Sequence, residues 1–209
     1  ELDHAENFVR AIRTAVGKSC DILFGSHGQM TPASAIRLAK RIEKFDPMWL
    51  EEPTPPANIT AMASIAKKIN IPVATGERLT TKYEFIALLK EEAASIIQMN
   101  LGRVGGILEA KKIAAIAEAS YAQVAPHMYC GPIIAAANVQ IAASISNFLI
   151  IEGIETWSGF DASLIIDPLK WEDGYIVPSE KPGLGIEINE SKLEEYPYKE
   201  SKLHLEMSD

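Results

Sequence analysis

Six residues with polar or ionisable side chains recur along the sequence at intervals of about 25 residues. They are His27, Glu51, Glu77, Asn100, His127 and Glu152. Carboxylates are hard oxygen ligands that suit Mg²⁺, and a histidine can take or return a proton near neutral pH. Together they could remove the proton next to a substrate carboxylate, a reaction whose dianionic enediolate needs a metal to share its charge.

The elements that must position these residues are short strands alternating with helices. The strands are expected over 20–24, 47–50, 71–75, 94–99, 121–125 and 147–151. Helices are expected over 1–17, 31–45, 59–69, 80–91, 105–120 and 131–146. Short apolar strands that alternate with helices are typical of a parallel sheet buried on both faces. No glycine-rich phosphate loop follows the first strand, which favours a barrel over a doubly wound sheet.

The carboxyl ends of barrel strands meet at one mouth, where eight loops converge. Each residue alone has a structural explanation, since Glu51 could cap the following turn and His127 could satisfy a buried carbonyl. Carboxylates and histidines at five of the six strand ends instead favour a common reactive site.

The composition narrows the class of partner. The chain has 209 residues, of which 47% are hydrophobic, enough for a sizeable core. The net charge of −8 argues against nucleic acid or an anionic membrane surface as the partner. A small anionic substrate is compatible with this charge if a metal supplies local positive charge. Cys20 and Cys130 show no paired spacing, so we expect neither a disulfide framework nor structural zinc, and a cytoplasmic location.

The two ends of the chain differ from its centre. The sequence opens inside the helix expected over 1–17, so we expect a chain truncated at its N-terminus. After residue 155 the strand–helix rhythm stops, and 171–190 carries the alternation and turn residues of a hairpin. We therefore expect a partial barrel over 1–155 and a C-terminal extension over 156–209 that packs on the barrel and on a lid domain.

Three further side chains near the strand ends need an interpretation. Glu52 is adjacent to Glu51 and so points elsewhere, and we expect it in a helix-side or interface salt bridge. Arg78 could steady the Glu77 carboxylate or bind a substrate carboxylate. Cys130 is expected to be a packed thiol, because no base lies beside it in the sequence.

Five segments carry a resemblance to a known family: "FGSHGQMTPASAIRLAKRIEKFDPMWLEEPTPP", "IPVATGERLTT", "IIQMNLGRVGGILEAKKIAAIAEA", "QVAPHMYCGP" and "NFLIIE". The sequence resembles the enolase superfamily in its mandelate racemase subgroup, and particularly the galactonate dehydratase-like sugar-acid dehydratases. The likeness runs through nearly all of residues 1–190. It implies an α/β fold of the TIM-type (β/α)7β barrel class, of which this chain would hold about six βα units without the lid domain. It also implies Mg²⁺, a small sugar acid as substrate, and a homo-oligomer.

The resemblance also implies a role for each strand-end residue. Glu51 in "LEEP" and Glu77 in "GER" match metal ligands. His127 in "APH" matches the general base, and His27 matches the histidine that protonates the departing hydroxyl. Glu152 in "LIIE" matches the carboxylate that hydrogen-bonds the substrate or the developing enediolate.

Two positions depart from the pattern of that family. Gly25 stands where the family has an aspartate as its first metal ligand. Asn100 stands where the family has an aspartate paired with the base histidine. We expect the amide oxygen of Asn100 to orient the imidazole of His127, without stabilising an imidazolium by charge.

Three functions therefore stay open. The first is a Mg²⁺-dependent dehydratase that removes water from a sugar acid by α-proton abstraction. The second is a racemase or epimerase of a hydroxy acid on the same scaffold. The third is a non-catalytic sugar-acid-binding homologue with a degenerate metal site, which Gly25 and Asn100 support.

Overall fold

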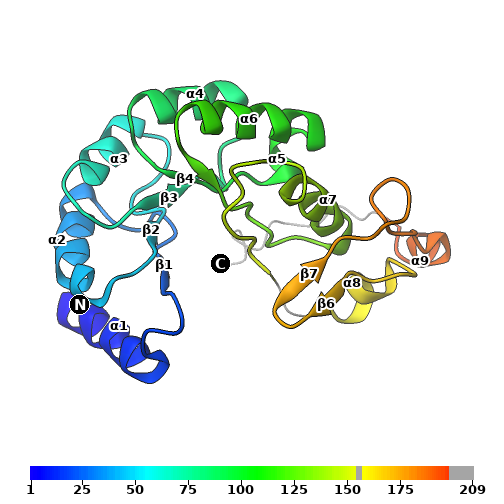
Figure 1. Cartoon of the computed structure of the whole chain (residues 1–209), viewed down its shortest axis with the longest axis horizontal. Helices are drawn as coiled ribbons and strands as arrows, with labels where there is room; N and C mark the ends of the chain where they lie inside the picture. Colours follow the sequence, from blue (N-terminus) through cyan, green and yellow to red (C-terminus); the bar gives the residue numbers. More distant parts are fainter. Residues whose placement is uncertain (154–156, 198–209) are drawn as a thin grey trace, which may run out of the picture.

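A parallel sheet forms the inner layer of the molecule (Figure 1). The computed structural model describes residues 1–153 and 157–197. The strands run in sequence order through the sheet and each pairs parallel with the next. They are β1 (Leu23–Gly25), β2 (Trp49–Glu51), β3 (Val73–Thr75), β4 (Ile96–Ile97) and β5 (Gln123–Val124). The predicted parallel α/β architecture is confirmed.

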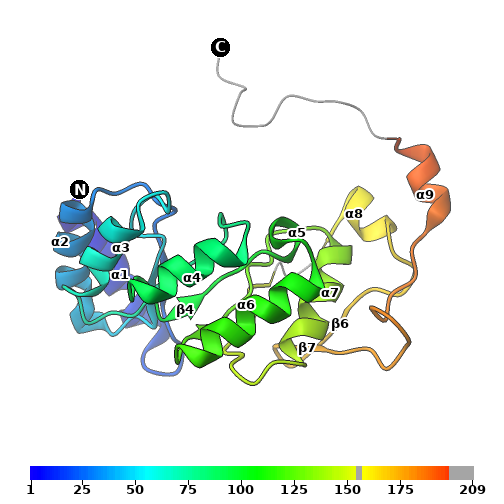
Figure 2. The ribbon, with the colours of Figure 1, turned by 90° about the horizontal axis from the view of Figure 1, so that it is seen from above.

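Helices cover the outer side of this sheet in an arc (Figures 1 and 2). They are α1 (Leu2–Val16), α2 (Pro32–Ile42), α3 (Ile59–Ala66), α4 (Lys82–Lys90), α5 (Leu101–Val104), α6 (Ile107–Ala119) and α7 (Pro132–Ala142), with a 3₁₀ turn at Glu43–Phe45 after α2. In the described part of the chain, no helix is both long and apolar enough to cross a membrane.

The starts of these helices follow from local sequence. Thr31 caps α2 by accepting a hydrogen bond from the backbone N–H of Ser34, and Pro32 occupies the first turn. A capping box opens α4, in which Thr81 and Glu84 each satisfy a backbone N–H of the other. These caps fix where each strand-to-helix loop ends.

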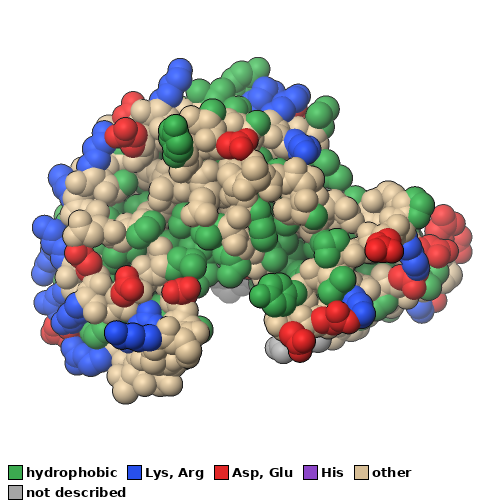
Figure 3. Space-filling model, viewed as in Figure 1, with side chains coloured by type: hydrophobic (Ala, Val, Ile, Leu, Met, Phe, Trp, Pro, Cys, Tyr) green, Lys and Arg blue, Asp and Glu red, His purple; other side chains and the backbone are tan. Residues whose placement is uncertain are grey.

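Alternating strand residues pack against two different layers. Leu50, Val73, Ile97 and Val124 belong to the large core between the sheet and the helices. A second cluster, on the inner face, consists of Trp49, Ala74, Ile96 and Ala125. Because successive strand side chains point to opposite faces, both faces of the sheet are buried. Figure 3 shows hydrophobic side chains gathered on the concave inner side of the arc.

The strand expected over 147–151 is reduced to a single parallel bridge. Phe148 pairs with Val124. The backbone N–H of Leu149 donates to the carbonyl of Val124 at 2.8 Å, and that of Val124 donates to Asn147 at 2.8 Å. Within the described residues, the parallel sheet thus consists of five ladder strands and this bridge, rather than six regular strands.

The chain after residue 157 contains a small antiparallel hairpin. Strands β6 (Lys170–Glu172) and β7 (Tyr175–Val177) pair around Asp173 and Gly174, both with positive φ, as in a tight primed turn. The predicted hairpin is confirmed there, flanked by α8 (Gly159–Ser163) and α9 (Glu190–Glu195). The expected boundary between residues 155 and 156 lies outside the described residues.

The interior position of β2, between β1 and β3, predicts a large stability cost for truncating the buried side chain of Leu50. Leu50 is 0% exposed, so Leu50→Ala should lower the free energy of unfolding of the complete protein by about 2–5 kcal/mol. Leu108, which is 68% exposed on α6, is the matched control, and Leu108→Ala should stay within about 0.5 kcal/mol of wild type. Urea unfolding measures both, and equal midpoints for the two variants would contradict the packing described here.

Candidate active site

Every predicted site residue lies at or just beyond the carboxyl end of a parallel strand. His27 follows β1, Glu51 ends β2, Glu77 follows β3, Asn100 follows β4, His127 follows β5, and Glu152 follows the bridge at Phe148. The register places Gly25 of β1 directly beside Glu51 of β2. Parallel pairing therefore brings residues far apart in the sequence to one edge of the sheet.

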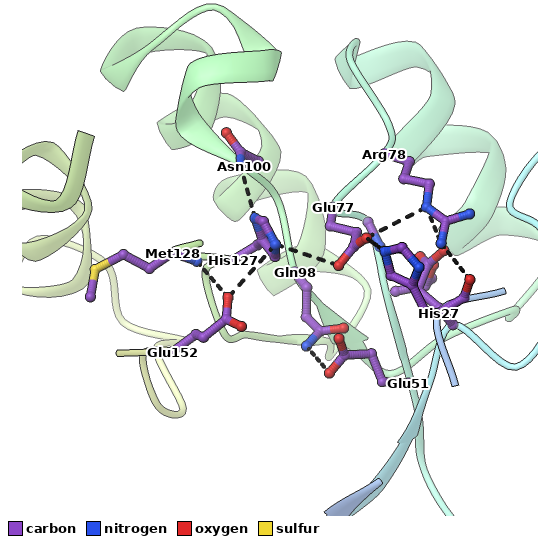
Figure 4. Close-up of polar contacts among 12 residues, drawn as sticks. His27, Glu51, Glu77, Arg78, Gln98, Asn100, His127, Met128 and Glu152 are labelled. Carbon is purple, nitrogen blue, oxygen red and sulfur yellow. Dashed lines mark hydrogen bonds and ion pairs between the residues drawn. The ribbon is translucent and has the colours of Figure 1, made fainter. Parts of the chain in front are cut away.

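Glu77 lies at the centre of the cluster (Figure 4). Its Oε1 is 3.3 Å from Nε2 of His27, and its Oε2 is 3.5 Å from Nε2 of His127. The side chain of Glu77 is 11% exposed and that of His127 is 15% exposed, whereas that of His27 is 71% exposed. One carboxylate thus joins two histidines that approach it from different strands.

His127 is held on both sides of its ring. Nδ1 lies 2.8 Å from Nδ2 of Asn100, and Nε2 lies 3.8 Å from Oε2 of Glu152. Glu152 is itself positioned by the backbone N–H of Met128, which donates to the same carboxylate oxygen at 2.7 Å. The ring therefore has a fixed orientation, with Nε2 facing the two carboxylates (Figure 4).

The expectation that the amide oxygen of Asn100 orients the imidazole is wrong. Asn100 is the N-cap of α5, and its Oδ1 accepts hydrogen bonds from the backbone N–H groups of Gly102 at 2.9 Å and Arg103 at 3.3 Å. The amide nitrogen consequently faces His127. The first backbone N–H groups of α5 have no acceptor within the helix and donate to Oδ1 of Asn100. The NH₂ group of Asn100 is therefore the part that faces the His127 ring.

Glu51 is held by two donors that sequence reasoning did not assign to the site. Its Oε2 accepts from Nε2 of Gln98 at 2.7 Å and from Nε1 of Trp49 at 3.1 Å. Gln98 precedes Asn100 by two residues in an extended segment, so the two share a face, and that spacing could have revealed Gln98.

The residues present fit a divalent metal only in part. Within residues 1–153 and 157–197, no group of three or more His, Cys, Asp or Glu side chains is arranged to hold a metal ion. Glu51, Gly25 and Glu152 line a cavity of about 270 Å³, in which Gly25 offers no ligand. Glu51 and Glu77 have the oxygen donors that Mg²⁺ prefers, and Mg²⁺ commonly keeps several waters beside one or two carboxylates.

Arg78 connects two of the strand-end loops. Its Nη2 donates to the backbone carbonyl of His27 at 2.6 Å, and its Nε lies 3.5 Å from Oε1 of Glu77. Of the two roles considered for Arg78, these contacts support steadying the Glu77 carboxylate.

The expectation that Glu52 forms a salt bridge on the side of a helix or at an interface is wrong, because the residue lies in the interior of the chain. The residue is 0% exposed, accepts hydrogen bonds from Thr75 Oγ1 and the Gly76 N–H, and lies 3.8 Å from Arg78. Burial raises the pKa of the Glu52 carboxyl, against the opposing effect of the hydrogen bond from Thr75. Glu52 thus links β3 and Arg78 from the interior, next to the site.

The parallel α/β fold, with carboxylates and histidines at its strand ends, is of the barrel type. The chain belongs to the family described as enolase C-terminal domain-like, which matches residues 1–192. Among solved structures, a putative mandelate racemase/muconate lactonizing enzyme from Labrenzia alexandrii has a TM-score of 0.93 and 55% identity, covering 100% of this chain and 54% of that one.

The curated relatives are named as sugar-acid dehydratases. A D-xylonate dehydratase from Haloferax volcanii is 36% identical over 194 residues, covering 93% of this chain and 47% of the relative. A D-gluconate/D-galactonate dehydratase from Picrophilus torridus is 34% identical over 198 residues, covering 94% and 50%. The chain spans about half the length of the curated relatives it matches.

One solved neighbour was obtained with a bound acid. It is a putative galactarate dehydratase from Agrobacterium radiobacter with bound Na and L-malate. Its TM-score is 0.87 at 32% identity, covering 97% of this chain and 55% of that one.

The two cysteines should differ sharply in reactivity. Burial, followed by the negative charge of Glu152, raises the pKa of the Cys130 thiol from 9.0 to about 11. The thiolate is the reactive form, so at neutral pH its fraction at Cys130 should fall about a hundredfold. Exposed Cys20 is the internal control. Mass spectrometry during N-ethylmaleimide treatment of the folded protein should find Cys20 labelled first, and half-buried Cys130 labelled far more slowly. Equal labelling rates in the folded protein would contradict the described burial.

Proposed function

We propose that this chain supplies the strand-end residues of a Mg²⁺-dependent dehydratase that removes water from a sugar acid of the aldonate or galactonate type. The observation that carries the proposal is the position of Glu77 between His27 and His127, which gives two proton-transfer groups on different strands around one carboxylate. The sugar-acid dehydratases among the relatives support the substrate class.

The proposed reaction divides the proton transfers between the two histidines. His127 takes the α-proton of the acid, and the electron pair left behind expels the β-hydroxyl. His27 gives that hydroxyl a proton so that it leaves as water, and the enol product becomes a 2-keto-3-deoxy acid. His27 suits the second role because it is the more exposed of the two rings and can exchange protons with solvent.

The carboxylates would hold the metal and the substrate. Glu51 and Glu77 would bind Mg²⁺, with Glu51 oriented by Gln98 and Trp49. When bound, Mg²⁺ would stabilise the negative charge that develops on the substrate carboxylate. Glu152, fixed by the Met128 N–H, would accept a hydrogen bond from a substrate hydroxyl.

A second candidate function has its own supporting observation. A sugar-acid-binding protein without proton-transfer activity is favoured by the lack, in the described ranges 1–153 and 157–197, of a three-ligand metal group. A racemase or epimerase would need a base on each face of the substrate, and for it His27 would have to act as a base rather than as a leaving-group acid.

We also propose that the protein acts in the cytoplasm as a homo-oligomer. The two cysteines, neither of them in a disulfide within the described residues, support the location, and the family resemblance supports the oligomer.

The first test follows the α-proton of candidate substrates. The complete protein that contains this chain is incubated in D₂O with Mg²⁺ and a panel of aldonates and aldarates, and NMR follows α-proton exchange and water loss. Both should occur for at least one acid and stop when EDTA removes the metal. His27→Asn should reduce water loss by about 10²-fold or more while exchange persists.

His4→Asn, on the exposed start of α1, is the matched histidine control and should retain full activity. Loss of both exchange and elimination in His27→Asn would remove His27 from the acid role. If no acid of the panel exchanges even at high Mg²⁺, the binding-protein alternative replaces the dehydratase.

Restoring a third carboxylate should strengthen metal binding. A Cβ built on Gly25 meets no atom within 4 Å, and Gly25 lies in register with Glu51, so Gly25→Asp should fit without displacing its neighbours. The added oxygen ligand should lower the Kd for Mg²⁺ by about tenfold or more, measured by calorimetry.

Gly25→Asn has nearly the same shape without the charge and is the control. If the aspartate and asparagine variants bind Mg²⁺ equally, the cavity at Gly25 is not part of a metal site.

A further inference from the structure

The hydrogen bond between Asn100 and His127 has a direction that can be assigned from its surroundings. The amide of Asn100 lies between the first turn of α5 and the imidazole ring, and the residue is only 7% exposed. An amide group offers a donor on its nitrogen side and an acceptor on its oxygen side. Which side faces the ring is decided by what the other side must satisfy.

The start of α5 requires the oxygen. The backbone N–H groups of Gly102 and Arg103 lie 2.9 Å and 3.3 Å from Oδ1, and groups at this position have no acceptor within the helix. A rotated amide would set its NH₂ against both of these donors and would lose the two hydrogen bonds that Oδ1 accepts. The NH₂ group is therefore held toward Nδ1 of His127, at 2.8 Å.

The opposite edge of the ring agrees with this direction. A donor from Asn100 requires a lone pair on Nδ1, so the single proton of the neutral ring lies on Nε2. Nε2 faces Oε2 of Glu77 at 3.5 Å and Oε2 of Glu152 at 3.8 Å, and both oxygens are acceptors. We propose that Asn100 fixes neutral His127 as its Nε2–H tautomer, so that the ring presents a proton donor, and not a base, to the site.

The tautomer has a consequence for substrate binding and proton transfer. A ring that shows N–H to the site would hydrogen-bond an oxygen of the acid, such as its carboxylate. To accept a proton at Nε2, the neutral ring must instead carry its own proton on Nδ1. The Nδ1–H group would then face the NH₂ group of Asn100, and two donors would oppose each other. Asn100 is thus a positioning residue that restrains His127 as a base. This consequence rests on the proposed function, whereas the tautomer assignment does not.

Nitrogen NMR reports the tautomer directly. The complete protein is labelled with ¹⁵N-histidine, and long-range ¹H–¹⁵N correlations are recorded at about pH 8.5, well above the ordinary histidine pKa. His127→Gln identifies the His127 signals by their loss. The wild-type ring should show an unprotonated Nδ1 and a protonated Nε2. A protonated Nδ1 in the wild-type protein would overturn the proposal by itself, even if no variant folds.

Asn100→Asp is the decisive variant because it preserves the cap of α5. Aspartate caps a helix as well as asparagine, but it offers only acceptors to the ring. Nδ1 of His127 should therefore gain a proton in this variant. Asn138→Ala is the matched control, since Nδ2 of Asn138 contacts His127 only at its backbone carbonyl, at 3.4 Å. It should keep the wild-type nitrogen pattern. An Asn100→Asp ring with unprotonated Nδ1, or an Asn138→Ala ring altered in the same way, would overturn the assignment.

Exchange kinetics separate this inference from the proposed function. With the nitrogen pattern as expected, Asn100→Asp should raise the rate of α-proton exchange by about tenfold or more, because His127 then has Nε2 free to act as a base. If the pattern is found but neither protein exchanges any sugar acid, the tautomer stands and the dehydratase proposal fails. If the wild-type protein exchanges with Nδ1 protonated, the dehydratase proposal stands and the tautomer fails.

Discussion

The parallel pairing of β1 to β5 is the constraint on which the rest of the structure depends. Each strand has only two or three residues in the ladder, and the register sets Gly25 beside Glu51 and Glu51 beside Ala74. Because every strand points the same way, every strand-end loop opens on one edge. A shift of one residue in this register would exchange the two buried faces and turn the reactive side chains into the helix layer.

Shared acceptors then organise the side chains at that edge. The carboxylate of Glu77 contacts both histidines. Oε2 of Glu51 accepts hydrogen bonds from both Gln98 and Trp49. Buried Glu52 accepts hydrogen bonds from Thr75 and from the Gly76 N–H, and it lies close to Arg78. Burying a carboxyl group is costly without hydrogen-bond donors, so this network restricts how far each of these side chains can move.

Much of this arrangement could be predicted from the sequence, since apolar runs and helix caps are local signals. Thr31 with Pro32 and Thr81 with Glu84 mark the helix starts at α2 and α4. Which end of the Asn100 amide faces His127 could not be predicted from the sequence, because the start of α5 and the imidazole ring both hydrogen-bond to the same amide. The burial of Glu52 and the reduction of 147–151 to a bridge depend on packing between distant segments, which no local pattern records.

The arginine that joins the loops after β1 and β3 also limits which residues position 28 can hold. A Cβ at Gly28 would lie 2.9 Å from Nη1 of Arg78, and Gly28 has a φ of 70°, where other residues are strained. Any side chain there would require a shift of the guanidinium, which contacts the His27 carbonyl and Glu77. A substitution at position 28 would therefore act on Arg78, so the two loops are coupled although about fifty residues of chain separate them.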